Sequence, residues 1–187
     1  NLLSVPLIGV SIGVGSIAEI QFDTGLHGRL NIESRHTAPL SDLLNVTGTT
    51  TTDVDDIVIG TKVRLAPEAP GRPAFGLRFA TRLPRAGNDR GLGLGTTDFV
   101  SSFLIGKTVQ SVRVVGNVGL GIIGDPLQGN QQNKVFAYGV SFARAVTTGL
   151  EVVGEFNGKA DTSGDDVPPP GAENRAMMRL GTRYTHG

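Results

Sequence analysis

Apolar and polar residues alternate with a period of two along most of this chain, a pattern typical of half-exposed β-strands. In the run 57–65, for example, Ile57 and Ile59 fall on one face of an extended strand, whereas Lys62 and Arg64 fall on the other. The pattern predicts nine strands, at about residues 3–12, 17–24, 55–65, 73–83, 98–108, 111–122, 134–146, 149–158 and 176–185.

Two segments fit this alternation poorly. The run Phe99–Thr108 is apolar on both faces, so the pattern predicts a strand there without giving its orientation. The stretch Ala38–Val46 is the best helical candidate, and it is short. Several predicted strands reach about ten residues, which is longer than ordinary soluble strands and close to the length that crosses a bilayer when tilted.

The connections between the predicted strands alternate in length. The short ones are Val14–Ser16, Ala66–Arg72, Val109–Gln110 and Thr147–Thr148. The long ones, which are polar and rich in residues that break strands, are Gly25–Val54, Pro84–Thr97, Ile123–Asn133 and Lys159–Arg175. Strict alternation places every long loop at the same end of an up-and-down meander, as in transmembrane barrels.

We therefore predict an all-β fold, an antiparallel up-and-down transmembrane β-barrel that forms one domain over residues 1–187. Bacterial single-chain barrels have even strand counts, so about nine strands predict a barrel that is truncated at one or both ends. The chain contains no run of about 18 apolar residues, so no membrane-spanning helix is predicted. The chain opens at Asn1 without a basic segment, so no signal peptide is predicted within it.

In a membrane barrel the apolar side chains of each strand face lipid and the polar ones face the lumen. On this interpretation the lipid-facing residues include Ile57, Ile59, Phe75, Leu77, Phe79, Val112, Val114, Phe136, Tyr138 and Phe142. The lumen-facing residues, which are candidates for a substrate or ion pathway, are Glu19, Gln21, Asp23, Lys62, Arg64, Arg78, Arg82, Arg113, Asn117, Glu151, Glu155, Arg179 and Arg183. No mid-strand charge falls on the lipid side, where it would cost about 2–4 kcal/mol.

The lumen-facing charges have mixed signs, and successive strands carry opposite ones. Glu151 and Glu155 lie on the strand before Arg179 and Arg183. Opposite charges on adjacent strands pair across the ladder, and each pair contributes about 0.2–1 kcal/mol. We therefore expect most lumen-facing arginines to fill and stabilise the barrel.

Arg78 and Arg82 are the best candidates for a functional role among these cations. They share one face of a strand, and Lys62 and Arg64 lie on the same face of the preceding strand. The result is a local positive excess, which would attract anions or polar solutes as charged rings do in other pores.

A soluble β-sandwich or barrel, acting as a binding or structural module, is the alternative fold, since its strands also have one apolar and one polar face. The two folds differ in whether the apolar face is enclosed or points outward. A polar face built from Gly, Ala, Ser and Asn with isolated charges favours the membrane barrel. The chain has no Trp and only two Tyr, so few residues could form the aromatic girdles of a membrane barrel, which is evidence against that fold.

Composition narrows the classes of function further. The 187 residues contain no Cys, which excludes disulfides and thiolate metal sites. Lys and Arg number 17, as do Asp and Glu, and this balance argues against a nucleic-acid-binding protein. The 27 glycines fit strands that line a cavity better than they fit a packed core.

No catalytic or metal-binding motif accounts for the polar residues. Gly91–Gly95 lacks the Lys-Ser/Thr pair of a phosphate-binding loop, and the chain has no G-x-S-x-G sequence. His27, His36 and His186 have no second ligand at metal spacing, and the Asp clusters in the loops lack full calcium-loop spacing. We therefore predict no enzyme activity, no cofactor and no metal.

Distinctive strand and turn motifs lie at Ala18–Asp23, Gly76–Pro84, Gly91–Gly95, Thr97–Phe99, Leu104–Lys107 and Gly116–Pro126. Together they resemble a bacterial outer-membrane family named for the meta-pathway of phenol degradation, over residues 5–185. The resemblance implies a barrel in the outer membrane that passes small organic molecules, hydrophobic or aromatic ones included. Its partners would be membrane lipid and the solute, without nucleic acid. The family offers no catalytic residue to carry over, and no oligomeric state follows.

Overall fold

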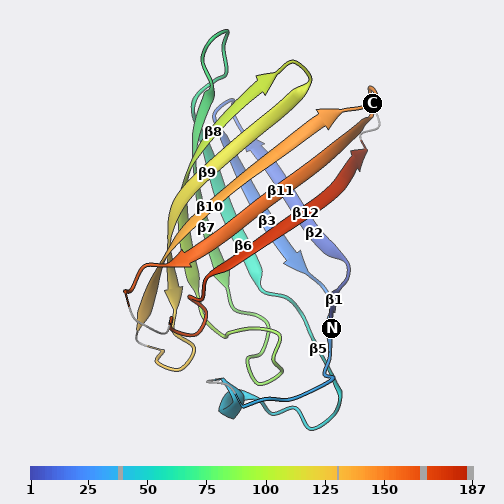
Figure 1. Ribbon diagram of the computed structural model, residues 1–187, viewed down its shortest axis with the longest axis vertical. Helices are drawn as coiled ribbons and strands as arrows, with labels where there is room; N and C mark the ends of the chain where they lie inside the picture. Colours follow the sequence, from blue (N-terminus) through green and yellow to red (C-terminus); the bar gives the residue numbers. More distant parts are fainter. Residues whose placement is uncertain (38–39, 130, 165–167, 185–187) are drawn as a thin grey trace.

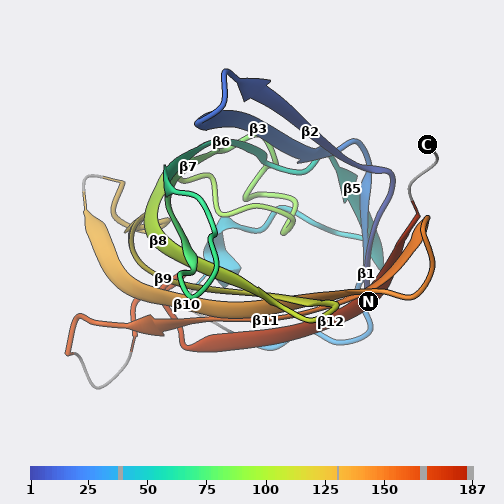
Figure 2. The same ribbon diagram turned by 90° about the horizontal axis from the view of Figure 1, so that it is seen from above.

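The computed structural model describes residues 1–37, 40–129, 131–164 and 168–184. Within them, nine antiparallel strands form one sheet in the order β12-β11-β10-β9-β8-β7-β6-β3-β2, which curls into a half-barrel (Figures 1 and 2). Its strands are β2 (Leu7–Val14), β3 (Ala18–Gly25), β6 (Ile57–Ala66), β7 (Ala74–Leu83), β8 (Asp98–Val109), β9 (Val112–Gly124), β10 (Gln132–Ala145), β11 (Leu150–Asp161) and β12 (Arg175–Tyr184). The predicted all-β antiparallel meander is confirmed.

The structure corrects the predicted first strand at 3–12. This segment is two strands, β1 (Leu2–Ser4) and β2, which are separated by Val5 and Pro6. β1 pairs with β4 (Gly28–Asn31), and β4 pairs with β5 (Thr50–Asp53) in a separate three-stranded sheet. Pro6 has no N–H to donate to a ladder, which is consistent with a break at this point.

The first long loop and the helical candidate are also corrected. The predicted loop 25–54 contains β4 and β5, which are four residues long and too polar for alternation to reveal. Of the candidate Ala38–Val46, only the one-turn 3₁₀ helix η1 (Ser41–Leu43) is helical, and residues 38–39 lie outside the described part of the chain. Over the described residues, no helix has the length and apolar character needed to cross a membrane.

The predicted short and long connections lie at opposite ends of the sheet, but their lengths do not alternate strictly: residues 67–73 join β6 to β7 and residues 125–131 join β9 to β10, which is seven residues in each case. The connections β2–β3, β6–β7, β8–β9 and β10–β11 gather at one end of the half-barrel, which we call the turn end (Figure 1). The connections β3–β6, β7–β8, β9–β10 and β11–β12 gather at the opposite end, the loop end. A sheet of consecutive antiparallel neighbours requires this arrangement.

Strand pairing resolves the orientation of β8, which alternation left open. Leu77 on β7 lies opposite Phe103, and Arg82 lies opposite Asp98. Because directly opposed residues share a face of a sheet, Phe103 joins the apolar face and Asp98 joins the polar one. Residues of the polar face line a hollow of 440 Å³ at the turn end, so the polar face is the concave side of the half-barrel.

Large apolar side chains remain exposed on the convex face. Leu120 is 65% exposed, Phe142 44% and Phe79 38%. The register places all ten predicted lipid-facing residues on this face: Ile57, Ile59, Phe75, Leu77, Phe79, Val112, Val114, Phe136, Tyr138 and Phe142. No second sheet covers these side chains in the described chain, so the β-sandwich alternative is not the observed fold.

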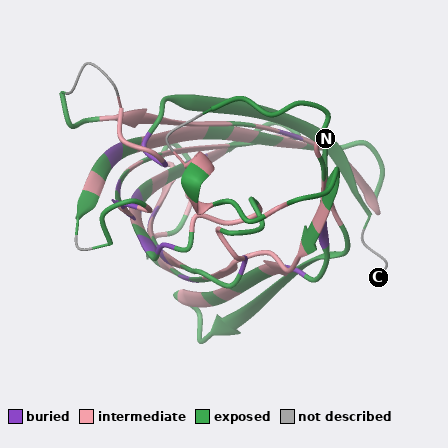
Figure 3. Ribbon diagram, turned by 90° about the horizontal axis from the view of Figure 1, so that it is seen from below, coloured by how far each residue is buried: buried purple, intermediate pink, exposed green. Residues whose placement is uncertain are grey.

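Few of the described apolar residues are buried inside the half-barrel. One cluster of buried apolar residues, Ile123, Val135 and Ala172, lies where the β11–β12 loop meets β9 and β10. The two edge strands, β2 and β12, are exposed along their whole lengths (Figure 3). Neither edge has a further hydrogen-bonded neighbour within the described residues.

Candidate functional site

The concave face carries the candidate site. The register brings all thirteen predicted lumen-facing residues onto this one face, over β3, β6, β7, β9, β11 and β12: Glu19, Gln21, Asp23, Lys62, Arg64, Arg78, Arg82, Arg113, Asn117, Glu151, Glu155, Arg179 and Arg183. Side chains two residues apart on a strand point the same way, so pairing of adjacent strands builds a continuous polar surface. Cations outnumber anions in this set.

Ion pairs between neighbouring strands organise the β11–β12 side of this surface. Arg179 lies directly opposite Glu155, with Nη1 3.3 Å from Oε1. Arg183 lies opposite Glu151, and its Nε donates to Oε2 at 2.7 Å. The sequence-based expectation that these charges pair is confirmed. Both pairs are largely exposed, so each contributes little to stability.

A chain of hydrogen bonds crosses from β6 through β3 to β7. Lys62 Nζ lies 2.7 Å from a carboxylate oxygen of Glu19, and Gln21 Nε2 donates to the other at 2.7 Å. Gln21 Oε1 in turn accepts from Arg78 Nε at 2.8 Å. Arg78 is therefore held in place by a neutral amide, and no carboxylate pairs with it among the described residues.

Arg82 has a different environment from Arg78. Its Nη2 donates to Asp98 on β8, and its Nη1 lies 3.4 Å from Asp56, just before β6. Asp98 also accepts from the N–H of Gly124 on β9, at 3.2 Å. Two carboxylates thus offset the charge of Arg82, and the cluster joins β6, β7, β8 and β9 at the loop end.

Asp56 extends this cluster into the β7–β8 loop. Its Oδ1 accepts from the backbone N–H groups of Arg85 at 2.9 Å and Ala86 at 3.0 Å. Sequence reasoning missed Asp56 and Asp98 as partners of Arg82. Asp98 lies on the same strand face as Ser102, four residues away, and both face β7 arginines by register. This relationship follows only once the orientation of β8 is known.

The remaining predicted lumen residues serve turns and close packing. Arg64 donates to the backbone carbonyl of Ser16 in the β2–β3 turn. A Cβ on Gly139 would lie 2.7 Å from Asn117 Nδ2, so the glycine leaves room for that amide. Arg113 lines the turn-end hollow together with Arg179 and Arg183, and no described residue forms an ion pair with it.

The described residues hold no group of three or more His, Asp and Glu side chains that could bind a metal ion. What the concave face offers is a polar, mainly cationic surface along an open curved sheet. Such a surface can attract and guide charged or polar solutes. It contains no nucleophile–base pair at the positions described above.

Comparison with known protein families identifies a family for this chain. The model of the family described as "Putative MetA-pathway of phenol degradation" matches residues 5–185, which is nearly the whole chain. No curated protein and no solved structure matches.

Proposed function

The chain belongs to this phenol-degradation family, and from that premise we propose that it is a β-barrel channel of a bacterial outer membrane. It would pass small organic molecules, and the family's description favours aromatic compounds among them. Its partners would be membrane lipid and the solute. The proposed role is passive passage, in which the protein catalyses no reaction.

The observation that carries this proposal is the exposed apolar convex face opposite a charged concave one. Leu180 and Met178 on β12 are 70% and 71% exposed, and apolar exposure continues across β9 and β10. Contiguous apolar surfaces of this kind mark contact with lipid or another protein. A band that follows every strand of a curved sheet fits lipid, which surrounds a barrel on all sides.

The placement of charge on the convex face supports the same conclusion. By register, the convex cations on the main sheet are Lys107, Lys134 and Arg144, and each lies within three residues of a strand end. Long cationic side chains near the ends of membrane strands can extend to the polar interface. Strands β8 to β11 have 12 to 14 residues, which is enough to cross a bilayer at a tilt.

Passage also requires that the exposed edges of β2 and β12 be paired. Unsatisfied backbone N–H and C=O groups are not tolerated in hydrocarbon, so a working barrel needs a strand partner at each edge. The proposed channel is therefore the closed form of this sheet, and its tests use the full-length protein.

Vesicle swelling tests the proposal directly. We would reconstitute the full-length protein and measure swelling in isosmotic 4-hydroxybenzoate, an aromatic anion that crosses lipid slowly. Swelling faster than in protein-free vesicles is expected. Equal rates, with the protein shown to be folded by its heat-dependent gel migration, would reject the channel.

A further inference from the structure

A cavity of 790 Å³ lies at the loop end of the half-barrel. It is open to solvent, and it is lined by residues within 30–37 and 40–46 and by part of the β7–β8 loop. Seen from below, η1 and its neighbouring segments lie across the open end of the half-barrel (Figure 3). The volume falls within the range of small-molecule sites, about 300–1,000 Å³. The cavity therefore lies where a solute would approach the concave face.

Much of the cavity lining is aliphatic, with side chains from both sides, and we call this part the aliphatic wall. Its half-buried apolar side chains are Leu30, Ile32, Leu40, Leu43, Val46 and Leu94. Leu44 adds a side chain that is 47% exposed. An apolar wall of this extent would gain free energy by covering an apolar ligand body, at about 25 cal/mol per Å² removed from water.

The polar part of the lining carries a positive excess. Its charged side chains include two guanidinium groups, those of Arg35 and Arg90, and one carboxylate, that of Glu33. The Arg35 guanidinium donates to the carbonyls of Val46 and Gly48 at 2.5 Å each, and it has no carboxylate partner in the described chain. Arg90 lies 3.8 Å from Asp53. Neutral carbonyls orient the Arg35 group without cancelling its charge, so it can still attract an anion.

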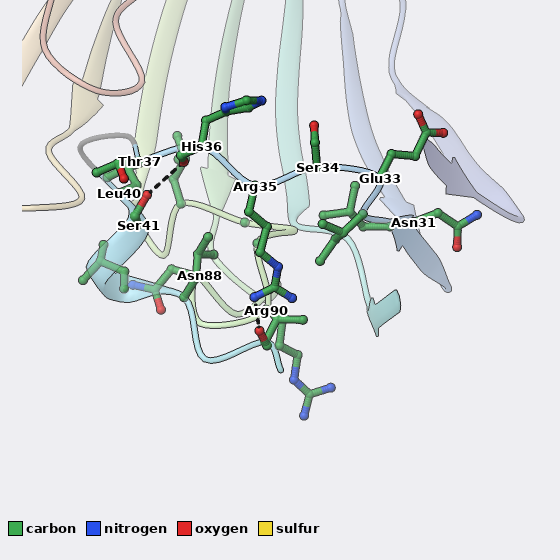
Figure 4. A pocket seen from close by; sticks show the side chains of 18 of the residues that line it. Asn31, Glu33, Ser34, Arg35, His36, Thr37, Leu40, Ser41, Asn88 and Arg90 are labelled. Carbon is green, nitrogen blue, oxygen red and sulfur yellow. Dashed lines mark hydrogen bonds between the residues drawn. The ribbon is translucent and has the colours of Figure 1, made fainter. Parts of the chain in front are cut away.

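The two neighbours Arg35 and His36 project in opposite directions (Figure 4). His36 points toward the strands of the half-barrel, whereas Arg35 points into the loop cluster near Arg90. Asn88 of the β7–β8 loop adds an amide to the same lining.

We propose that this cavity is an entry site for aromatic carboxylates, an inference that rests on the proposed channel function. The aliphatic wall would cover the ring, and the cationic lining would hold the carboxylate. Binding here would raise the local concentration of solute at the loop end before it reaches the concave face. The chemistry selects for an apolar body with one negative charge.

Titration with 2-naphthoate tests the site, because naphthalene fluorescence is not obscured in a protein without Trp. We expect saturable binding to the full-length protein in detergent, compared with protein-free micelles, and at least tenfold weaker binding of the neutral analogue 2-naphthamide. Equal affinity for the two compounds would overturn the assignment to carboxylates. Absence of saturable binding would overturn the site itself.

A matched pair of variants tests whether 2-naphthoate binds in this cavity. Leu44→Glu puts a negative charge on its wall, whereas Leu26→Glu puts the same charge on a leucine that is also 47% exposed and does not line it. We expect Leu44→Glu to weaken 2-naphthoate binding at least tenfold and Leu26→Glu to change it less than twofold. Equal losses would place the binding elsewhere.

Uptake measurements separate this inference from the proposed function. In vesicles, Leu44→Glu should raise the half-saturating concentration of 2-naphthoate uptake and leave the maximal rate unchanged. Wild-type uptake without saturable binding would overturn the entry site and leave the channel standing. Binding without any uptake would overturn the channel function on which the entry role depends.

Discussion

The ring of Tyr138 on β10 covers Gly158, its direct partner on β11. A Cβ on Gly158 would collide with the phenol ring, and the same relationship joins Phe142 to Gly154, four residues further along each strand. Both rings lie on the convex face, where the Tyr138 ring stacks on Phe136 at a centroid distance of 6.1 Å and lies tilted against Phe156 at 6.2 Å. The two glycines thus allow aromatic rings to lie against the sheet.

Replacing Gly158 should therefore destabilise the fold. Gly158→Ala forces the Tyr138 ring to move, and overpacking of this kind costs about 1–3 kcal/mol. Gly181→Ala on the neighbouring strand is the matched control, since its Cβ would have only Val153 nearby, at 3.8 Å. Urea unfolding in detergent compares the two variants. A loss for Gly181→Ala as large as that for Gly158→Ala would contradict the packing account.

The Arg82 cluster should matter more for stability than the exposed pairs. Arg82→Met leaves Asp98, which is 8% exposed, without its cationic partner, and an unsatisfied buried group costs about 1–3 kcal/mol. Arg179→Met removes an exposed pair and should cost at most about 1 kcal/mol. Unfolding free energies of the two variants provide the comparison, and equal values would show that the cluster is not a stabilising centre.

Acid should loosen the β6–β7 turn. The pKa of Glu68 lies below its ordinary value of 4.5, first because the backbone N–H of Thr108 donates to the carboxylate and also because Lys107 lies 3.4 Å away. A lowered folded pKa means that the ionised group stabilises the fold above about pH 4.5 and that this contribution disappears as the pH falls below it. Wild type should exceed Glu68→Gln in unfolding midpoint at pH 7, and this difference should shrink as the pH falls below 4.5. A constant difference across this range would contradict the assignment.

Arg78 should set the charge preference of the proposed channel. Its guanidinium group donates a hydrogen bond to Gln21, and no described carboxylate offsets its charge. Arg78→Gln should lower the anion-to-cation permeability ratio up to about fivefold at low salt, since a unit charge at about 4 Å contributes about 1 kcal/mol in water. Reversal potentials in planar bilayers measure this ratio. Arg78→Lys keeps the charge and should keep the ratio; a loss in that variant would mean that guanidinium geometry, and not charge, is responsible.

Alternation alone predicted most of the sheet, because each strand has one apolar and one polar face that a period of two records. It placed Ile57 and Lys62 on opposite faces of one strand, and it placed Glu155 and Arg179 on the same face, where they pair. Prediction from alternation failed where a segment does not alternate. Phe99–Thr108 needed the pairing with β7 for its orientation, and β5, with the sequence Thr-Thr-Thr-Asp, is entirely polar.

The cavity at the loop end could not be predicted in this way. Its lining joins Leu30 of β4, Leu44 after η1 and Leu94 of the β7–β8 loop, which have no regular spacing in the sequence, so only the folded chain brings them together. The partners of Arg82 were missed for a related reason. Asp56 lies just before β6, and its contacts with Arg82 and with the β7–β8 loop depend on how that loop packs.

The central claim is that the convex face contacts lipid, and the exposure of spin labels on the two faces tests it most directly. Because the chain has no Cys, single nitroxide labels can be attached at Val118→Cys and Val140→Cys on the convex face and at Asn117→Cys and Ser141→Cys on the concave one. In reconstituted full-length protein, collision with oxygen, which concentrates in lipid, should dominate at 118 and 140, and collision with a water-soluble nickel complex should dominate at 117 and 141. Labels at 118 and 140 that meet the nickel complex as often as those at 117 and 141, or that are shielded from both reagents, would contradict a lipid-facing barrel.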